Sequence, residues 1–154
     1  MKRHEIRIIP ATTELLQSFI PQIRQLDLEE VEITSGESWE EHSKELFTHQ
    51  AEAEVIMYKG KILGVLGVRK LEPPNVGLAW LLMTNHVEDN QIAFLRWSRK
   101  HLKKILSNYD FLTNLVYLKN TLHVNWLNWL GAEWLETSDP DFGVFRLRKA
   151  VSDV

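Results

Sequence analysis

The sequence has no cysteine among its 154 residues. This absence excludes disulfide frameworks, thiolate metal sites and cysteine nucleophiles. The six histidines include no pair at the HxxxH spacing that would place two metal ligands on one helical face. Glycine and proline are scarce, at 7 and 5 residues, which argues against a collagen-like or linker-rich chain. The length predicts a single domain over residues 1–154, and we expect no metal site in it.

Neither sign of charge dominates, and long apolar runs are missing. The net charge of −3 argues against extensive nucleic-acid binding. No apolar run reaches the length of about 18 residues that a membrane span needs. The start, Met1 to Glu5, leads into a short alternating segment and not into an apolar signal core. We therefore expect no nucleic-acid or membrane partner, and a protein that stays in a cytoplasm or is packaged after synthesis there.

What is present is an ordinary globular composition, with 44% hydrophobic and 25% charged residues. Hydrophobic periodicity predicts an order of β-α-α-α-β-β-β-α-β-α-β-β, which is a mixed α/β system. The expected strands cover residues 6–9, 54–58, 61–68, 76–84, 111–118, 132–135 and 144–149. The first expected helix begins after Thr12 or Thr13, and Pro21 either kinks it or starts a second helix that runs to about Thr34. A third follows a capping box at Ser38 and ends near His49, and two more cover about 90–107 and 121–130.

Several residues predict local detail within these elements. Gly36 and Gly131 are expected at helix C-termini, where glycine adopts left-handed backbone angles. Gly64 and Gly67 lie inside a strand, which predicts a bulge or a close backbone approach. The continuous apolar strand 76–84 is expected at the centre of the sheet. On helix 90–107 the expected inward side chains are Ile92, Leu95, Leu102, Ile105 and Leu106.

The element order, together with the helix that Asn120 opens and Leu130-Gly131 closes, resembles the GNAT (Gcn5-related N-acetyltransferase) fold. The resemblance covers nearly the whole chain and implies an α/β domain with a mixed central sheet of six to seven strands flanked by helices. The details resemble most the small GNAT-like proteins of tailed bacteriophages, some of which are regarded as internal virion proteins and others as acetyltransferases. The residues that carry this resemblance are Ile23-Arg24, Asp27, Glu30-Val31, Ser35-Gly36, Ala79-Trp80-Leu81-Leu82, Thr84, Asn120-Thr121, His123, Trp126-Leu127 and Leu130-Gly131-Ala132. The resemblance implies residence in the host cytoplasm or packaging in the virion.

The loop between strand 76–84 and helix 90–107 tests the enzyme interpretation. The resemblance implies that acetyltransferases of this fold hold the CoA pyrophosphate there, on backbone amides of an Arg/Gln-x-x-Gly-x-Gly/Ala turn at a helix N-terminus. This chain has residues 85–91, Asn-His-Val-Glu-Asp-Asn-Gln, with no glycine and with two carboxylates, Glu88 and Asp89. Acidic side chains at a helix start are favourable caps that compete with phosphates for the same amides. We therefore expect acetyl-CoA binding to be weak or absent.

The same resemblance names candidate site residues. Leu82, Met83 and Thr84 would hold the pantetheine arm, with Asn120 orienting the thioester. The tyrosine that serves many family members as general acid falls on Leu127, which leaves His123 as the nearest titratable group. The spacing of His123 with Trp126, Leu127 and Leu130 also fits a buried packing residue.

A second cluster follows helical spacing at Arg24, Asp27 and Glu30. One interpretation makes Glu30 or Asp27 the acceptor for a substrate amine. The other is an ion pair between Arg24 and Asp27 on the helix surface.

The sequence leaves two functions open. The first is an acyl-CoA-dependent N-acetyltransferase-like protein in which Glu30, Asn120 and His123 are catalytic. The second is a catalytically inactive GNAT scaffold that serves as a phage structural or internal virion protein.

The scaffold interpretation predicts partner contacts with other phage virion proteins or with further copies of the chain. Trp126 and Trp129 lie on adjacent faces of a short helix, so we expect one to be buried and Trp129 to contact a partner. Residues 27–54 hold ten acidic residues against one base, Lys44, whereas the helix 90–107 is basic. Solvated helix faces or charged docking surfaces both fit this pattern.

Overall fold

A computed structural model describes residues 5–72 and 75–149 of the chain. The described chain divides into two compact units, which we treat separately. Unit 1 covers residues up to 68 together with 80–94, and unit 2 covers 69–79 together with the residues from 95 onward. The expectation of one domain over residues 1–154 stays a prediction. No helix in the described ranges is both long and apolar enough to span a membrane.

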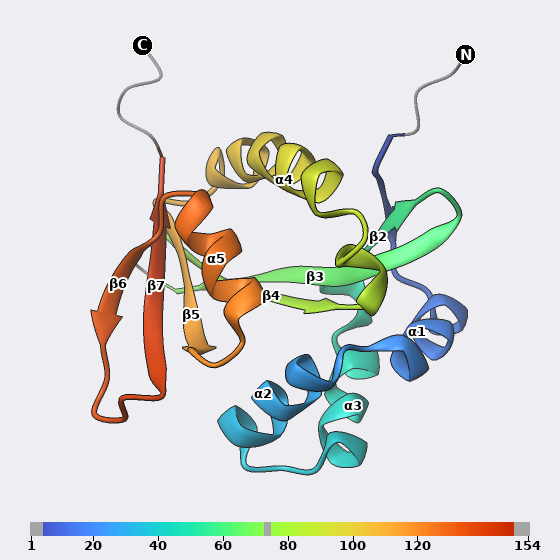
Figure 1. The fold of residues 1–154 in the computed structure, drawn as a ribbon, viewed down its shortest axis with the longest axis horizontal. Helices are drawn as coiled ribbons and strands as arrows, with labels where there is room; N and C mark the ends of the chain where they lie inside the picture. Colours follow the sequence, from blue (N-terminus) through green and yellow to red (C-terminus); the bar gives the residue numbers. More distant parts are fainter. Residues whose placement is uncertain (1–4, 73–74, 150–154) are drawn as a thin grey trace. The chain divides into compact units, whose positions relative to one another are not determined.

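Figure 1 shows the helices and strands that the periodicity predicted, with most boundaries within three residues of the expected ones. The exception is α2, which begins at Gln25, four residues after Pro21. The strands are β1 (Arg7–Pro10), β2 (Ala53–Tyr58), β3 (Lys61–Leu71), β4 (Val76–Met83), β5 (Phe111–Tyr117), β6 (Glu133–Glu136) and β7 (Phe142–Arg148). The helices are α1 (Thr13–Phe19), α2 (Gln25–Ser35), α3 (Trp39–Thr48), α4 (Gln91–Leu106) and α5 (Thr121–Trp129), with short 3-10 helices η1 (Ile20–Gln22), η2 (Gln50–Glu52) and η3 (Asn85–Val87).

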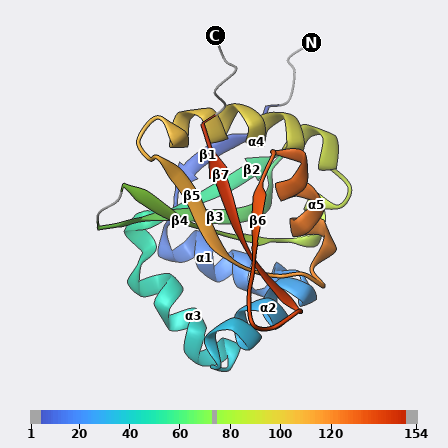
Figure 2. The same ribbon diagram turned by 90° about the vertical axis from the view of Figure 1, so that its left-hand side faces the viewer.

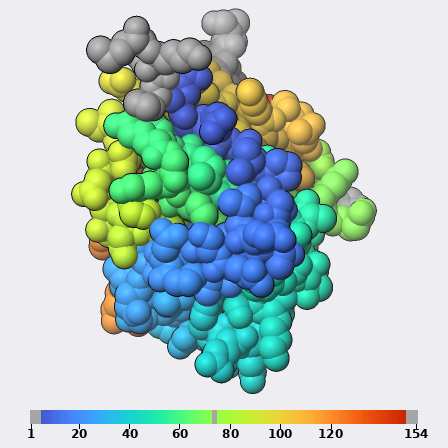
Figure 3. All heavy atoms as spheres, turned by 90° about the vertical axis from the view of Figure 1, so that its right-hand side faces the viewer, coloured from blue at the N-terminus to red at the C-terminus, as the bar shows by residue number. Residues whose placement is uncertain are grey.

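The helix ends follow the predicted capping residues. The Thr12 side chain accepts a hydrogen bond from the backbone N–H of Leu15, and Ser38 accepts one from Glu41. These bonds satisfy amides that have no partner inside the first helical turn. Gly36 ends α2 in the left-handed region, with φ 73°. Figure 3 shows α1, α2 and α3, coloured blue to cyan, together on one surface of unit 1.

Within the described residues, seven strands form one mixed sheet in the order β1-β2-β3-β4-β5-β7-β6. This number and the mixed pairing confirm the predicted fold class. β4 is the fourth strand in the order, which confirms its predicted central place. β4 and β5 pair in parallel over only three residues of each strand, Val76 to Leu78 and Phe111 to Thr113. Beyond that point the side-chain amide of Asn114 donates to the carbonyl of Ala79, at 2.8 Å.

The two glycines of β3 meet β4 closely, as predicted. The β2–β3 register shifts between Ile56 and Met57, which marks an irregularity beside Gly64. A Cβ at Gly64 would lie 2.6 Å from the carbonyl oxygen of Leu82, and one at Gly67 would lie 2.4 Å from the Trp80 ring. Any larger side chain would therefore displace backbone or indole atoms of β4.

Unit 1 has a core in which α1 and α3 contribute side chains that pack with the inner strands. The buried members of this cluster are Leu16, Phe19, Ile23, Leu46, Ala53, Val55, Ile62, Val65 and Leu82. These residues come from the apolar positions of the predicted helices and strands. Their burial holds the connection between α1 and α2, which includes Ile23, in place for the contacts described below.

Unit 2 buries the sheet face that carries Leu112, Val116, Phe145 and Leu147. Trp134 is the register partner of Phe145 on this face, and its indole N–H donates to the Asn128 side chain of α5. α5 therefore lies on this face of β5–β7–β6.

The predicted end of α5 is confirmed at Gly131, which has φ 92°. The N–H of Ala132 bonds to Leu127 O and that of Gly131 to Asn128 O, both at 3.0 Å. This is the Schellman arrangement.

One prediction for α4 is wrong. Ile92 was expected to point inward, but it is 68% exposed. The buried residues of α4 are Phe94, Ser98 and Leu106, which recur at four- and eight-residue intervals. Ile92 precedes Phe94 by two residues, or about 200° around the helix, so it faces away from this stripe.

Candidate functional site

The carboxyl end of β4 is closed by the segment that leads into α2. Ile23 and Thr84 form an isolated antiparallel bridge. The N–H of Arg24 donates to the carbonyl of Met83 at 2.9 Å. The N–H of Met83 donates to the Asp27 carboxylate at 2.6 Å. Both backbone polar groups of Met83 are thus bonded to residues 24 and 27 of the same unit.

Arg24 and Asp27 form a buried ion pair. The Arg24 Nη1 and Asp27 Oδ1 atoms lie 2.6 Å apart, and the two side chains are 6% and 0% exposed. The ion-pair interpretation of these residues is therefore right about the partners and wrong about their place, because the pair lies inside unit 1 and not on the helix surface. Asp27 is in the first turn of α2, where a negative charge also interacts favourably with the helix dipole.

Thr84 is fully buried and has its hydrogen-bonding groups engaged within unit 1. Its N–H donates to Leu63 O at 2.9 Å, and its hydroxyl donates to Ile62 O at 2.7 Å. The same hydroxyl accepts from the N–H of His86 at 3.3 Å. The role of Leu82, Met83 and Thr84 in holding a cofactor stays a prediction. A cofactor that used the amides of Met83 or Thr84 would first have to displace these bonds.

The loop between β4 and α4 bonds to itself. Four of its amides donate within the loop: His86 and Val87 to Thr84, Glu88 to Asn85, and Asn90 to Val87, at 3.0 to 3.3 Å. The Asn90 side chain also donates to the His86 carbonyl, at 2.8 Å. A phosphate site of the kind expected from the family needs such amides directed at the ligand. In this loop these four are already hydrogen-bonded.

Glu88 has a different partner from the one that the sequence predicted. Its carboxylate accepts from Arg24 Nε at 3.2 Å, whereas an interaction with the helix start was expected. The loop is thereby tied to the Arg24–Asp27 pair across 64 residues of sequence. Sequence reasoning missed this contact because no local pattern relates residues so far apart.

Asn120 and His123 are both buried in unit 2. Asn120 precedes α5 and is fully buried, and His123 lies in the first turn of that helix. Leu127, at the position of the family's tyrosine, is buried on the same helix. Glu30 lies in α2 of unit 1, half-buried, and its carbonyl accepts from the Thr34 hydroxyl at 2.7 Å. A shared catalytic role for Glu30, Asn120 and His123 stays a prediction.

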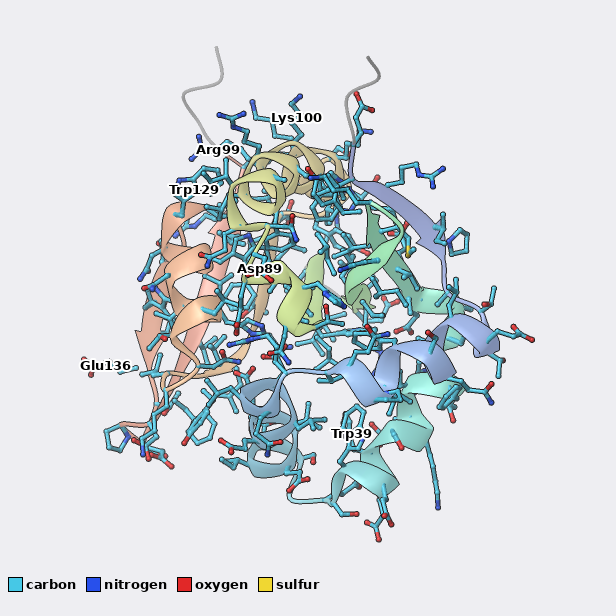
Figure 4. All side chains as sticks on the ribbon, turned by 45° about the vertical axis from the view of Figure 1, so that its right-hand side comes forward. Trp39, Asp89, Arg99, Lys100, Trp129 and Glu136 are labelled. Atoms are coloured by element: carbon cyan, nitrogen blue, oxygen red, sulfur yellow. The ribbon has the colours of Figure 1, made fainter. Side chains whose placement is uncertain are left out.

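The two tryptophans of α5 have different surroundings. The Trp126 indole N–H donates to the Ser98 hydroxyl at 3.0 Å, and the residue is half-buried. Trp129 is 38% exposed, and the Arg99 guanidinium lies 3.8 Å from its ring centroid. Figure 4 shows Arg99 and Lys100 directed outward from α4, with Trp129 beside Arg99. The contact of Trp129 with a partner stays a prediction. Its stacking with Arg99, thirty residues away, was not foreseen.

The described residues contain no group of three His, Asp or Glu side chains that could hold a metal ion.

Burial, assisted by the nearby Lys104, lowers the pKa of His101 below its ordinary value. His101 stacks on Trp97 with ring centroids 4.8 Å apart. A lowered pKa favours the neutral imidazole in this position.

Sequence comparisons give one match. A profile of the family described as "Bacteriophage T7, probable scaffold protein Gp13" matches residues 75–137, which is less than half of the chain. Among curated proteins, no sequence matches this chain.

Structural comparisons give many matches at low sequence identity. A domain from Methanocaldococcus jannaschii DSM 2661 is 15% identical, with a TM-score of 0.67 over 95% of this chain and 99% of that one. The spermidine N-acetyltransferase from Vibrio cholerae, solved in complex with CoA and spermine, is 10% identical, with a TM-score of 0.67 over 92% and 93%. The GNAT-family acetyltransferase from Bacillus anthracis is 11% identical, with a TM-score of 0.67 over 94% of each chain. These similarities confirm the GNAT fold, and the finer resemblance to the phage branch stays a prediction.

Proposed function

We propose that this chain is a GNAT-fold protein that has lost standard acetyl-CoA binding and serves as a structural or internal virion protein of a bacteriophage. The observation that carries the proposal is the hydrogen bond from the Met83 N–H to the buried Asp27 carboxylate, at 2.6 Å. The self-bonded loop 85–90 supports it independently, because four amides there have partners within the loop. The match of residues 75–137 to a phage scaffold family supports the phage context.

In this proposal the protein acts through contacts with other virion proteins or with further copies of itself. Trp129 is the proposed contact residue, since a partly exposed tryptophan stacked by an arginine offers both apolar area and a cation. Buried aromatic anchors of this kind often contribute about 2 kcal/mol or more to an interface. The proposed location is the host cytoplasm, with packaging into the particle.

The alternative is an acyl-CoA-dependent N-acetyltransferase, which rests on the fold shared with CoA-bound structures such as the Vibrio cholerae enzyme. Fold similarity alone does not establish chemistry. In this alternative Asn120 orients the thioester, His123 serves as acid or base, and Glu30 accepts the amine.

A titration with acetyl-CoA, followed by thermal unfolding, separates the two functions. A ligand that binds only the folded state stabilises it by about 2.7 kcal/mol at one hundred times its dissociation constant. We expect no stabilisation by sub-millimolar acetyl-CoA. A shift of that size would refute the proposal and favour the enzyme.

A paired variant makes the titration sharper. Glu88→Gln/Asp89→Asn removes the two loop carboxylates and leaves the backbone bonds of the loop in place. Because those backbone amides stay hydrogen-bonded within the loop, the variant should also fail to bind acetyl-CoA. Tight binding by the variant alone would show that charge, and not the closed backbone, excludes the cofactor.

A further inference from the structure

An apolar row crosses three strands of unit 2. Leu115 of β5 is the register partner of Val144 of β7, and Val144 is in turn the partner of Leu135 of β6. Side chains that are directly opposite on neighbouring strands lie about 5 Å apart, so the three form a continuous strip. Beside them the rings of Tyr117 and Phe142 lie 5.5 Å apart. We call these five residues the open face.

The open face lies on the opposite side of the sheet from α5. Its residues alternate along β5 and β7 with the buried side chains of the other face. Figure 2 looks onto β7, β6 and β5, and α5 of the same unit is drawn beside these strands and not in front of them. Leu115 is 39% exposed and Leu135 is 53% exposed. A contiguous apolar patch of this kind on a sheet face is typical of an interaction surface.

Charges of opposite sign lie on the two sides of the apolar row, toward the two ends of the strands that it crosses. At one end lie Glu136, the last residue of β6, and Asp139 and Asp141 of the β6–β7 connection, with Lys119 at 4.0 Å from Asp141. At the other end three cations, Arg146, Arg148 and Lys149, accompany two carboxylates, Glu133 and Asp110. Glu133 bridges Arg146 and Arg148 at 3.1 and 2.8 Å, and these bonds lower its pKa.

We propose that the open face binds the same face of a second copy of this chain, related by a two-fold axis that runs along the Leu115–Val144–Leu135 row. A two-fold axis makes an interface self-complementary, so each residue of the row meets its own copy. The strands of the two copies then run antiparallel. Asp141 lies three residues before Val144 and Arg148 four residues after it, so the acidic end of one copy faces the basic end of the other.

The area of the face predicts a weak dimer. β5 and β7 have seven residues each and β6 has four. At about 4.8 Å between strands and about 3.3 Å per residue, these 18 residues give a flat area of about 285 Å² per copy. A standard stable interface buries about 800 Å² per partner. The dimer therefore belongs to the weak class and is favoured where copies are concentrated, as in an assembling particle.

This inference goes beyond the proposed function and does not depend on it, because an enzyme could dimerise in the same way. It is also separate from the Trp129 contact, since Trp129 belongs to α5, on the other side of the sheet. The two surfaces can therefore be tested by different variants.

The test is sedimentation velocity of the full chain from about 10 μM to about 1 mM, the range in which weak complexes form. We expect the wild type to convert from monomer to dimer in this range, and the dissociation constant to rise with salt because the paired ends are exposed. Leu115→Thr/Leu135→Thr should raise the dissociation constant at least tenfold. Ile92→Thr is the matched control, because Ile92 is an exposed aliphatic residue outside the face, and it should leave the dimer unchanged.

A cross-linking experiment tests the axis itself. The chain has no cysteine, so Leu135→Cys introduces a single thiol. A short bismaleimide should join two copies through this residue at high concentration, and should not join copies of Ile92→Cys. A wild type that stays monomeric at 1 mM overturns the proposal, as does a dimer that the double variant leaves intact. If the double variant does not fold, failure of Leu135→Cys to cross-link overturns it instead.

Discussion

Replacing Asp27 with alanine should be among the most damaging single changes in unit 1. The substitution leaves the Arg24 side chain, which is 6% exposed, without the carboxylate that lies 2.6 Å from its guanidinium. It also removes the acceptor of the buried Met83 N–H. Breaking a buried ion pair by removing one partner costs about 3–5 kcal/mol. Because a domain has a total stability of about 5–15 kcal/mol, this loss is at least about a fifth of it.

Equilibrium urea unfolding, followed by tryptophan fluorescence, measures this loss as a lower midpoint with an unchanged slope. Glu88→Gln is the control: it removes the other carboxylate of Arg24, but that side chain is 52% exposed, so the cost should stay below about 1 kcal/mol. Arg24→Met/Asp27→Asn keeps an acceptor for Met83 and removes both charges, so it should recover most of the stability. A loss below 1 kcal/mol for Asp27→Ala would refute the buried pair.

Three further changes test other parts of the structure. Gly131→Val should lower the unfolding free energy by about 1–3 kcal/mol because residue 131 has φ 92°, and Gly131→Asn should lower it less. Equal melting temperatures of the valine variant and the wild type would show that the end of α5 is misplaced. Trp126→Ser should lower the unfolding free energy by about 3 kcal/mol, whereas Trp129→Ser should leave the fold intact and reduce self-association or incorporation into a particle. His101 has a lowered pKa in the folded state, so the unfolded state binds more protons as the pH falls below about 6.5. Its contribution to stability is therefore present above that pH and lost on acidification, and the melting temperature of His101→Phe should fall less with acid than that of the wild type.

Most of the fold could be predicted because its determinants are local. Thr12, Ser38, Gly36 and Gly131 are each read from a few neighbouring residues, and each ends or begins a helix as expected. Strand positions follow from apolar runs in the same way. Ile92 shows the limit of this reasoning, since several helical registers fit the apolar residues of α4 and only tertiary packing selects the one that buries Phe94.

The site could be predicted only in part, because its decisive contacts join distant residues. Arg24 and Asp27 are three residues apart, so their pairing was foreseen. The bonds from Met83 to Asp27 and from Arg24 to Glu88 span 56 and 64 residues. No pattern in the sequence shows that the predicted surface pair is buried, or that it bonds to the end of β4.

The missing glycine in loop 85–90 and the bond between Asp27 and Met83 bear on cofactor binding in different ways. The missing glycine removes a favourable approach of the phosphates to the backbone. The bond adds a cost, because a cofactor that used the Met83 N–H would first displace a buried carboxylate. A hydrogen bond to a charged group contributes about 1.5–3 kcal/mol, so its loss weakens binding by a factor of about 10 to 10². A cofactor with otherwise micromolar affinity would then bind with a dissociation constant of about 10 μM to 0.1 mM, even before the loss of the loop contacts is counted.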